Sequence, residues 1–278
     1  MKKTLGRKIS NFIFTISCWI CIFIAVAILF IVLYSLISKG LPGINLKLFT
    51  ENLPPLGSDG GLLNAIKGSF IITGIAILIA MPIGILAATY LTEFNSAGKL
   101  NSMVRFVNDT LLSAPSIIIG LFVYGLIVKT LGHFSALAGI IALIIIAVPM
   151  IVRTSEDVMK IVPYTLREAA VSLGIPRWKV TFSIIYKSAV SGLITGVILA
   201  LARIAGETAP LLFTVLNNQF SNDNILHPMA NLPVVMFQYA MSPYENSQEL
   251  AWSAALIVTV VILVLNIFAR VFCQRKIN

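Results

Sequence analysis

The chain has 278 residues, of which 58 % are hydrophobic and 11 % are charged, and its formal net charge is +9. An ordinary soluble domain carries about 25 % charged residues, so this composition excludes a soluble globular domain. Most of the 20 lysines and arginines stand in four segments that alternate with weakly charged ones, which argues against a nucleic-acid-binding face. They are Lys2, Lys3, Arg7 and Lys8; Lys99 and Arg105; Arg153, Lys160, Arg167, Arg177, Lys179 and Lys187; and Arg270, Arg275 and Lys276.

The apolar residues fall in blocks long enough to cross a membrane. A hydrocarbon core about 30 Å thick needs roughly 20 apolar residues in a helix. Because basic residues collect on the cytoplasmic side, the four basic segments and both termini should be cytoplasmic. The sequence therefore predicts an all-α polytopic membrane protein of the cell membrane, with about six transmembrane helices. The predicted spans are residues 12–37, 66–91, 104–128, 134–153, 188–216 and 250–270.

The first span follows a basic start like that of a signal peptide. Its apolar run is too long for one and lacks a convincing small-residue cleavage site, so we expect a retained anchor. Cys18 and Cys21 form a C-x-x-C, and Cys273 makes the cysteine count odd. Because no βαβ pattern surrounds the motif, we interpret it as two small apolar residues on one helix face and not as a redox site.

Two segments rich in turn formers or polar residues, 38–65 and 217–249, predict the substantial outer loops. Pro82, Pro115 and Pro149 lie within or near the ends of spans. Membrane helices tolerate proline where neighbouring helices or water satisfy the freed carbonyls, so these prolines are either kinks at a pathway or packing features.

The longest inner loop, residues 154–187, has the pattern of two short helices. Pro163 can open a helix at Tyr164, and Gly174 can end that helix in a left-handed C-cap. Pro176 can then open a second helix. We predict a compact cytoplasmic knob.

Residue sizes in this knob suit contact with a protein partner. Ala169 and Ala170 are small enough for close approach, and Trp178 is large enough to anchor a contact. The spacing from Ala170 to Gly174 also resembles that of a DNA-binding helix-turn-helix. We reject that interpretation because Pro176 stands in the turn and membrane spans flank both helices.

The segment Glu168-Ala169-Ala170-x-x-x-Gly174, followed by Ile184, resembles the EAA loop of ABC-importer permeases. The family pattern ends in I-x-L-P, whereas this chain reads Ile-Ile-Tyr-Lys at residues 184–187. The resemblance implies that the loop forms coupling helices that bind in a groove of a cytoplasmic ATPase. The residues expected at that contact are Glu168, Ala169, Ala170, Gly174 and Trp178.

The fifth predicted span carries Arg203 and Glu207, and ionisable residues at membrane depth are costly enough to suggest function. Arg203 lies about 15 residues into the span, roughly 22 Å along the axis at 1.5 Å per residue. On a continuous helix, a single stripe would carry both the small residues and the charges, and it should face protein or an aqueous cavity. This stripe comprises Gly192, Gly196, Ala200, Arg203, Glu207 and Pro210.

The guanidinium of Arg203 is permanently charged and offers a planar fork of donors, which makes an oxyanion the natural substrate class. Glu207 could weaken anion binding enough for release, or accept a hydrogen bond from a protonated phosphate oxygen. Alternatively, the two residues only neutralise each other and lock adjacent helices. We expect Arg203, Glu207 and the neighbouring Thr208 to line a substrate path.

Two longer runs, residues 201–214 and 109–122, closely resemble the PstA-type family of phosphate-import permeases. The resemblance implies a type I ABC-importer permease (MetI-like) fold and a permease that forms half of a phosphate import path. It also implies a sister permease subunit, an ATPase dimer and an extracytoplasmic phosphate-binding protein as partners. We divide the chain into residues 1–65, with the cytoplasmic tail, first span and outer loop, and residues 66–278, the permease transmembrane domain.

Other functions remain as alternatives: a permease for another oxyanion, a passive anion channel, or an intramembrane enzyme. The sequence has no G-x-x-x-x-G-K-[ST], so ATP and Mg are expected on a separate ATPase and no cofactor on this chain. An enzyme would need a nucleophile and a base at matching depth, and we find no convincing set. His133 and His227 stand on flanks of different spans and are expected to be surface loop residues without metal partners.

Overall fold

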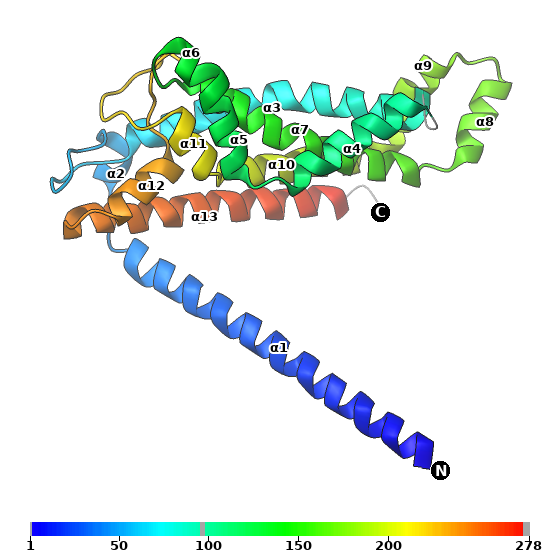
Figure 1. Cartoon of the computed structure of the whole chain (residues 1–278), viewed down its shortest axis with the longest axis horizontal. Coiled ribbons are helices and arrows are strands. Elements are labelled where there is room, and N and C mark those ends of the chain that lie inside the picture. Colours follow the sequence, from blue (N-terminus) through cyan, green and yellow to red (C-terminus); the bar gives the residue numbers. More distant parts are fainter. Residues whose placement is uncertain (1, 95–97, 275–278) are drawn as a thin grey trace.

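The computed structural model describes residues 2–94 and 98–274, and all regular structure in these two ranges is helical. Figure 1 shows the arrangement of the helices. Arg275 and Lys276 of the last predicted basic segment lie outside the described residues. The α-helices are α1 (Lys2–Gly40), α2 (Leu46–Thr50), α3 (Leu63–Thr89), α4 (Lys99–Ser113), α5 (Ser116–Val123), α6 (Lys129–Leu131), α7 (Ala136–Ile161), α8 (Tyr164–Ser172), α9 (Arg177–Val180), α10 (Tyr186–Ala205), α11 (Ala209–Thr214), α12 (Leu232–Ala240) and α13 (Glu245–Gln274), with π-helical turns η1 (Tyr90–Phe94), η2 (Tyr124–Val128) and η3 (Thr181–Ile185).

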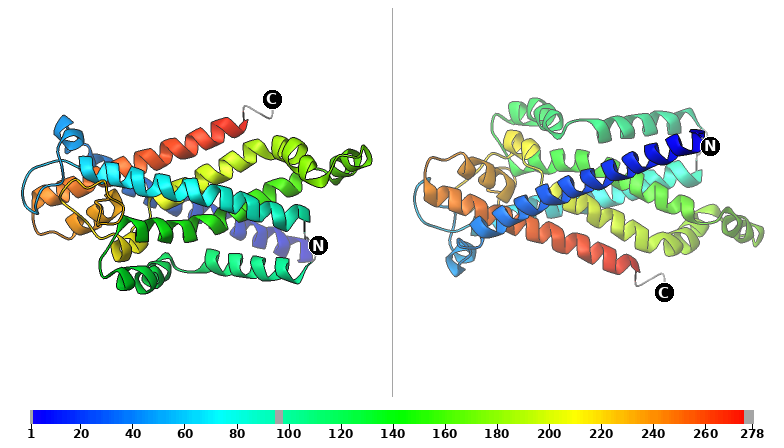
Figure 2. Two further views of the ribbon diagram at one scale, coloured as in Figure 1. Left: turned by 90° about the horizontal axis from the view of Figure 1, so that it is seen from above. Right: turned by 90° about the horizontal axis from the view of Figure 1, so that it is seen from below.

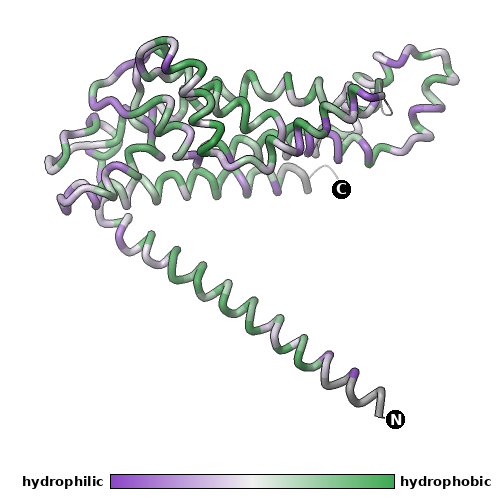
Figure 3. Tube along the Cα trace, in the orientation of Figure 1, coloured by the Kyte–Doolittle hydropathy of each residue, from purple (hydrophilic) through white to green (hydrophobic). Residues whose placement is uncertain are grey.

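Five helical runs are long and apolar enough to cross a membrane, and α4 with α5 to α6 make a sixth if that bent pair counts as one span. This confirms the prediction of about six. The long helices of the bundle run side by side, and apolar residues follow their length while hydrophilic ones gather toward the two ends (Figures 2 and 3). The five continuous runs are Ser10–Gly40, Leu63–Phe94, Ala136–Ile161, Arg177–Ala205 and Glu245–Val271.

The third predicted span, residues 104–128, was wrong as one continuous helix. Its two halves, α4 and α5, meet at an angle of 105°. The bend lies at Ala114, whose backbone is extended with φ −68° and ψ 134°, directly before Pro115. A proline ring clashes with a helical conformation of the residue before it, which explains the break. Pro82 and Pro149, by contrast, stand inside α3 and α7.

The core of the bundle is the pair α3 and α7. Small residues let the two backbones approach closely: a Cβ added to Gly84 of α3 would lie 2.7 Å from Cγ2 of Ile151 on α7. Ile72, Ala76 and Ala80 of α3 are fully buried in the same cluster. Close approach of this kind is the usual basis of helix association in a membrane, where lipid gives no hydrophobic driving force.

The first helix, α1, leaves the bundle at an angle (Figure 1). Almost none of its apolar window is buried within this chain. Its outer end is fixed to α13, where Ser253 donates a hydrogen bond of 3.2 Å to the carbonyl of Gly40. Cys18 and Cys21 are free and exposed on this helix.

At the opposite end from α8, the predicted outer loops fold over one another and include α2 and α12. Tyr239 of α12 is buried, and its hydroxyl donates a hydrogen bond to the carbonyl of Pro54. Burial raises the pKa of this hydroxyl to about 12. The hydroxyl joins two segments far apart in the sequence and so fixes the outer cap.

Candidate functional site

The fifth predicted span, residues 188–216, was also wrong as one helix. The helical run begins at Arg177 and ends at Ala205, and the short helix α11 follows after a break at residues 206–208. At the break the amide of Gly206 donates to the carbonyl of Arg203 at 3.3 Å, which is the tighter bonding of a helix end. Glycine weakens a helix, and a proline near the start of α11 opens the next one.

The small residues of the predicted stripe do face protein. A Cβ on Gly196 would lie 2.5 Å from Oγ1 of Thr154 on α7, and Gly192 faces Val158 one turn away. Ala200 is fully buried. The stripe as predicted was nevertheless too long, because α10 ends at Ala205: Glu207 lies in the break and Pro210 beyond it, so neither continues the face of α10.

Arg203 lies in the last turn of α10, and Glu207 lies in the break that follows. The guanidinium Nη2 is 3.7 Å from Oε1 of Glu207, and the two side chains are 51 % and 14 % exposed. This separation is longer than a charge-assisted hydrogen bond, so the ion pair does not use the donors of the guanidinium. Thr208 is partly buried beside Glu207, and its carbonyl accepts from Leu212 at 3.0 Å.

The break is held in place by α5. A Cβ on Gly120 would lie 2.6 Å from Cα of Pro210, so α5 and α11 meet almost backbone to backbone. The hydroxyl of Thr214 donates to the carbonyl of Pro210 at 2.7 Å and supports the other side of that turn. The bent third span thus positions the broken fifth one.

The structure of the predicted knob confirms the start of its first helix and the glycine cap at its end. Helix α8 begins at Tyr164, and Gly174 after it has φ +80°. Ile175 donates to the carbonyl of Ala170 at 3.3 Å and Gly174 to that of Val171 at 2.9 Å, which is a Schellman C-cap.

The second helix of the knob begins at Arg177, as predicted, but it is not a separate short helix. Helix α9 continues through η3 into α10, so the knob is joined directly to the broken span. No glycine or proline stands between Arg177 and Ser191 to interrupt the run.

The expected ATPase-contacting residues divide between two faces of the knob. Ala170 is buried with Met159 and Val162 of the α7 end, so its small size serves close packing inside the chain. Glu168, Ala169 and Gly174 are exposed. Two large apolar residues beside them are also exposed, Trp178 by 60 % and Leu173 by 81 %.

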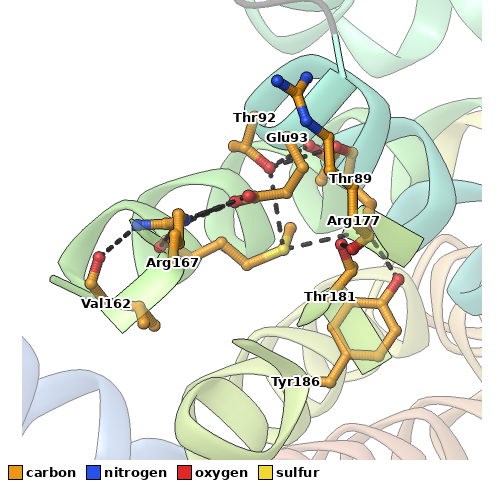
Figure 4. A network of polar contacts seen from close by, with 10 residues as sticks. Thr89, Thr92, Glu93, Val162, Arg167, Arg177, Thr181 and Tyr186 are labelled. Atoms are coloured by element: carbon orange, nitrogen blue, oxygen red, sulfur yellow. Dashed lines mark hydrogen bonds and ion pairs between the residues drawn. The ribbon is translucent and has the colours of Figure 1, made fainter. Parts of the chain in front are cut away.

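One ion pair beside the knob was not predicted from the sequence. Arg167 of α8 binds Glu93 of η1, with Nη2 2.9 Å from Oε1, and their side chains are only 16 % and 11 % exposed (Figure 4). The same guanidinium donates to the carbonyls of Met159 and Val162 at the end of α7. The only sign of this pair in the sequence was Glu93, an acidic residue just after the second predicted span.

A second charged cluster joins α4 to the inner half of α7. Glu156 is buried, and its Oε1 lies 2.5 Å from Arg105 Nη2 and 2.7 Å from Lys160 Nζ. Nearby, Arg153 lies 3.5 Å from Asp157 in a more exposed pair. In the sequence, the basic members of this cluster indicated only the orientation of the spans.

The two histidines, which were expected to be surface loop residues, are exposed and lie together. The rings of His133 and His227 stack with centroids 5.8 Å apart, and both residues are exposed. Within residues 2–94 and 98–274, no group of three or more His, Cys, Asp or Glu side chains is arranged to hold a metal ion.

Comparison with known proteins identifies the family. Residues 80–278 match the family described as "Binding-protein-dependent transport system inner membrane component". The "Phosphate transport system permease protein PstA" of Pasteurella multocida is 48 % identical over 270 residues, which cover 97 % of this chain and 96 % of that protein. The protein of the same name from Haemophilus influenzae is 52 % identical over 245 residues, covering 88 % and 87 %.

Solved structures share the fold at much lower identity. A chain of the MetNI methionine ABC transporter, solved in inward-facing conformations, matches with a TM-score of 0.61 at 17 % identity, covering 76 % of this chain and 92 % of its own. A chain of a bacterial alginate ABC transporter, solved with an alginate-bound periplasmic protein, matches with a TM-score of 0.64 at 16 % identity and 89 % coverage of each chain. These similarities confirm the predicted MetI-like, type I importer fold. The chain belongs to the family of binding-protein-dependent transport system inner membrane components, and within it to the phosphate transport system permease proteins named PstA.

Proposed function

We propose that this chain is the permease subunit of an ATP-driven phosphate import complex and forms half of the transmembrane path for inorganic phosphate. The observation that carries the proposal is a half-exposed arginine, Arg203, at a break in an otherwise apolar span. The chain is also about half identical to two proteins named as phosphate transport permeases.

Arg203 is suited to an oxyanion. A cation at membrane depth costs at least about 2.5 to 3.5 kcal/mol when lipid surrounds it, so the guanidinium should face protein or water. Its planar fork of donors matches two phosphate oxygens. Glu207, 3.7 Å away, would keep binding weak enough for release, or accept a hydrogen bond from a protonated phosphate oxygen. Thr208 adds a hydroxyl at the same level.

A sister permease subunit would complete the path. The half-exposed guanidinium of Arg203 should face protein or water and not lipid. The long helix α1 also buries almost none of its apolar surface within this chain. A second subunit of similar fold would cover both. The two subunits would then enclose the cavity that phosphate crosses.

The knob is the docking site proposed for the ATPase dimer, which would hold ATP and Mg, while this chain binds no cofactor. Leu173 and Trp178 expose large apolar side chains on the knob, where a protein groove can cover them. The start of α1 and the end of α13 point toward the same end of the molecule as α8 (Figure 2), which supports cytoplasmic termini. An extracytoplasmic phosphate-binding protein would dock on the outer loops.

The test is Arg203→Ala and Arg203→Lys in the assembled complex, with phosphate uptake and ATP hydrolysis measured separately. Both variants should lower uptake at least 10-fold, the alanine variant more, while the ATPase still copurifies. Arg270→Ala, at an exposed arginine near the inner end of α13, is the matched control. Normal uptake in both Arg203 variants would remove the proposed substrate role.

Copurification in mild detergent tests the partners independently. An ATPase and a second permease should accompany the chain, and Glu168→Lys should reduce the ATPase without removing the permease from the membrane. A chain that purifies alone would favour a passive anion channel or an enzyme.

A further inference from the structure

We infer that Arg167 and Glu93 form a side-chain joint that couples movement of α8 to the end of α3, in addition to the chain connections of the knob to α7 and α10. Both are positioning residues, since neither is proposed to touch phosphate. The inference rests on the proposed docking of an ATPase on the knob. It adds a specific pair of side chains that would carry the displacement into α3 and α7.

The geometry of Arg167 is that of a joint with three attachments. Nε lies 3.1 Å and 3.3 Å from the two carboxylate oxygens of Glu93, and Nη2 lies 2.9 Å from Oε1. Nη2 also donates to the carbonyl of Met159 at 2.8 Å, and Nη1 to that of Val162 at 2.5 Å. One side chain of α8 therefore holds the inner end of α3 and the last carbonyls of α7. A lysine has a single donor centre and cannot reproduce this set.

Beside this pair, open space lies between residues of η1 and residues of α8. Glu93 and Arg167 line two cavities, of about 620 Å³ and 340 Å³. One turn further along α8, Ala170 supplies a small apolar contact. A methyl side chain alone restrains orientation weakly, so we expect the ion pair to restrain α8 relative to α3.

The attachment continues toward the broken span. One turn before Glu93 on the same helical run, the hydroxyl of Thr89 lies 2.7 Å from that of Tyr186 at the start of α10. Figure 4 shows these contacts as one network around the inner ends of α3, α7 and α10. Helix α10 carries Arg203 at its far end. A displacement of α8 that pulls on Glu93 therefore acts on the helix that bears the proposed phosphate contact.

The functional test uses the assembled complex in proteoliposomes, with Arg167→Lys, Glu93→Gln and the double variant. The measured quantity is phosphate taken up per ATP hydrolysed. Each single variant should lower this ratio at least 10-fold while the ATPase copurifies at the wild-type level, and the double variant should be no worse than Arg167→Lys, which already lacks the bidentate contact to Glu93. Arg177→Lys, at an exposed arginine that lines the larger cavity, should leave the ratio unchanged.

A ratio that stays at the wild-type value in both single variants would overturn the inference. Loss of ATPase copurification in parallel with uptake would also overturn it, since the pair would then serve docking and not transmission. A wild-type complex that neither takes up phosphate nor binds an ATPase would overturn the proposed function. The inference about Arg167 and Glu93 would then be decided by spin-label distances within this chain alone.

A distance measurement tests the joint without reference to transport. Spin labels at Leu86→Cys on α3 and Leu173→Cys at the end of α8, both exposed positions, report the orientation of α8 in the full chain with its three native cysteines replaced by serine. The distance distribution should be narrow with the native pair and at least twice as broad with Arg167→Lys or Glu93→Gln. Equal widths would refute the joint whatever the substrate proves to be.

Discussion

Gly120 faces Pro210 where α5 crosses α11, and a side chain at this glycine should displace the break that holds Glu207. The added Cβ of Gly120→Ala would lie 2.6 Å from Cα of Pro210 and 3.3 Å from its Cβ and carbonyl oxygen. Carbon atoms pack favourably at about 3.5 to 4.0 Å. The two helices must therefore separate by about 1 Å, because a backbone atom cannot rotate away.

Overpacking of this kind typically costs about 1 to 3 kcal/mol. Pro210 stands three residues after Glu207, so a shift of about 1 Å at the crossing should change the ion pair, whose present separation is 3.7 Å. If this strain raises the free energy of a state in the transport cycle, a cost of about 1 to 3 kcal/mol lowers the population of that state by about 5- to 150-fold. We expect initial phosphate uptake to fall at least 5-fold, and further in Gly120→Val.

The assay is initial uptake of radiolabelled phosphate in cells whose other phosphate importers are deleted, normalised to the amount of permease in the membrane. Gly125→Ala is the control, because a Cβ at Gly125 on the same bent span meets no atom within 4 Å. Equal uptake in Gly120→Ala and Gly125→Ala, at equal membrane abundance, would show that α5 does not position the break.

Three further changes test other parts of the structure. Glu156→Gln should lower the stability of the purified complex by about 1 to 3 kcal/mol, measured by thermal unfolding. This is less than the loss for a fully buried ion pair, because Arg105 and Lys160 are partly exposed to water. The control Asp157→Asn should change the stability by less than about 1 kcal/mol, because its ion pair is exposed. Tyr239→Phe should cost about 1 to 3 kcal/mol relative to Tyr244→Phe, because a buried carbonyl loses its donor. Since burial raises the pKa of Tyr239 to about 12, its contribution should be full below about pH 10 and lost as pH rises through 12, which unfolding at graded pH would show. Gly174→Ala forces an alanine into φ +80°, which costs about 1 to 2 kcal/mol of conformational free energy. Hydrogen exchange of the amides in α8 should therefore become about 5- to 30-fold faster. Unchanged exchange would contradict the capping role of Gly174.

Features encoded by neighbouring residues could be predicted from the sequence. Hydropathy located the long spans, since each needs only a block of apolar residues. The start of α8 at Tyr164 and its end at Gly174 follow from a proline and a glycine within 12 residues of each other in the chain, and both were confirmed. Close packing by Gly192 and Gly196 followed from helical spacing alone.

Features made by distant residues, or by a local change of direction, could not be predicted in the same way. Hydropathy averages over a window, so it extends an apolar span through Ala114 and Gly206 although the helix stops at both. The partners Glu93 and Arg167 are 74 residues apart, and neither belongs to a periodic pattern that points to the other. The stacking of His133 on His227 likewise depends on how two outer loops fold together.

In the proposed complex, the half-exposed guanidinium of Arg203 is a charge that the sister subunit would shield from lipid. Inserted alone, the chain would present a charge to lipid and bear the desolvation cost, which a neighbouring subunit would remove on association. Removal of this desolvation cost lowers the free energy of the assembled complex relative to the separate subunits. If the proposed sister subunit exists, unassembled copies of this chain would be the less stable form in the bilayer, and a surplus of either subunit would be exposed to membrane proteolysis.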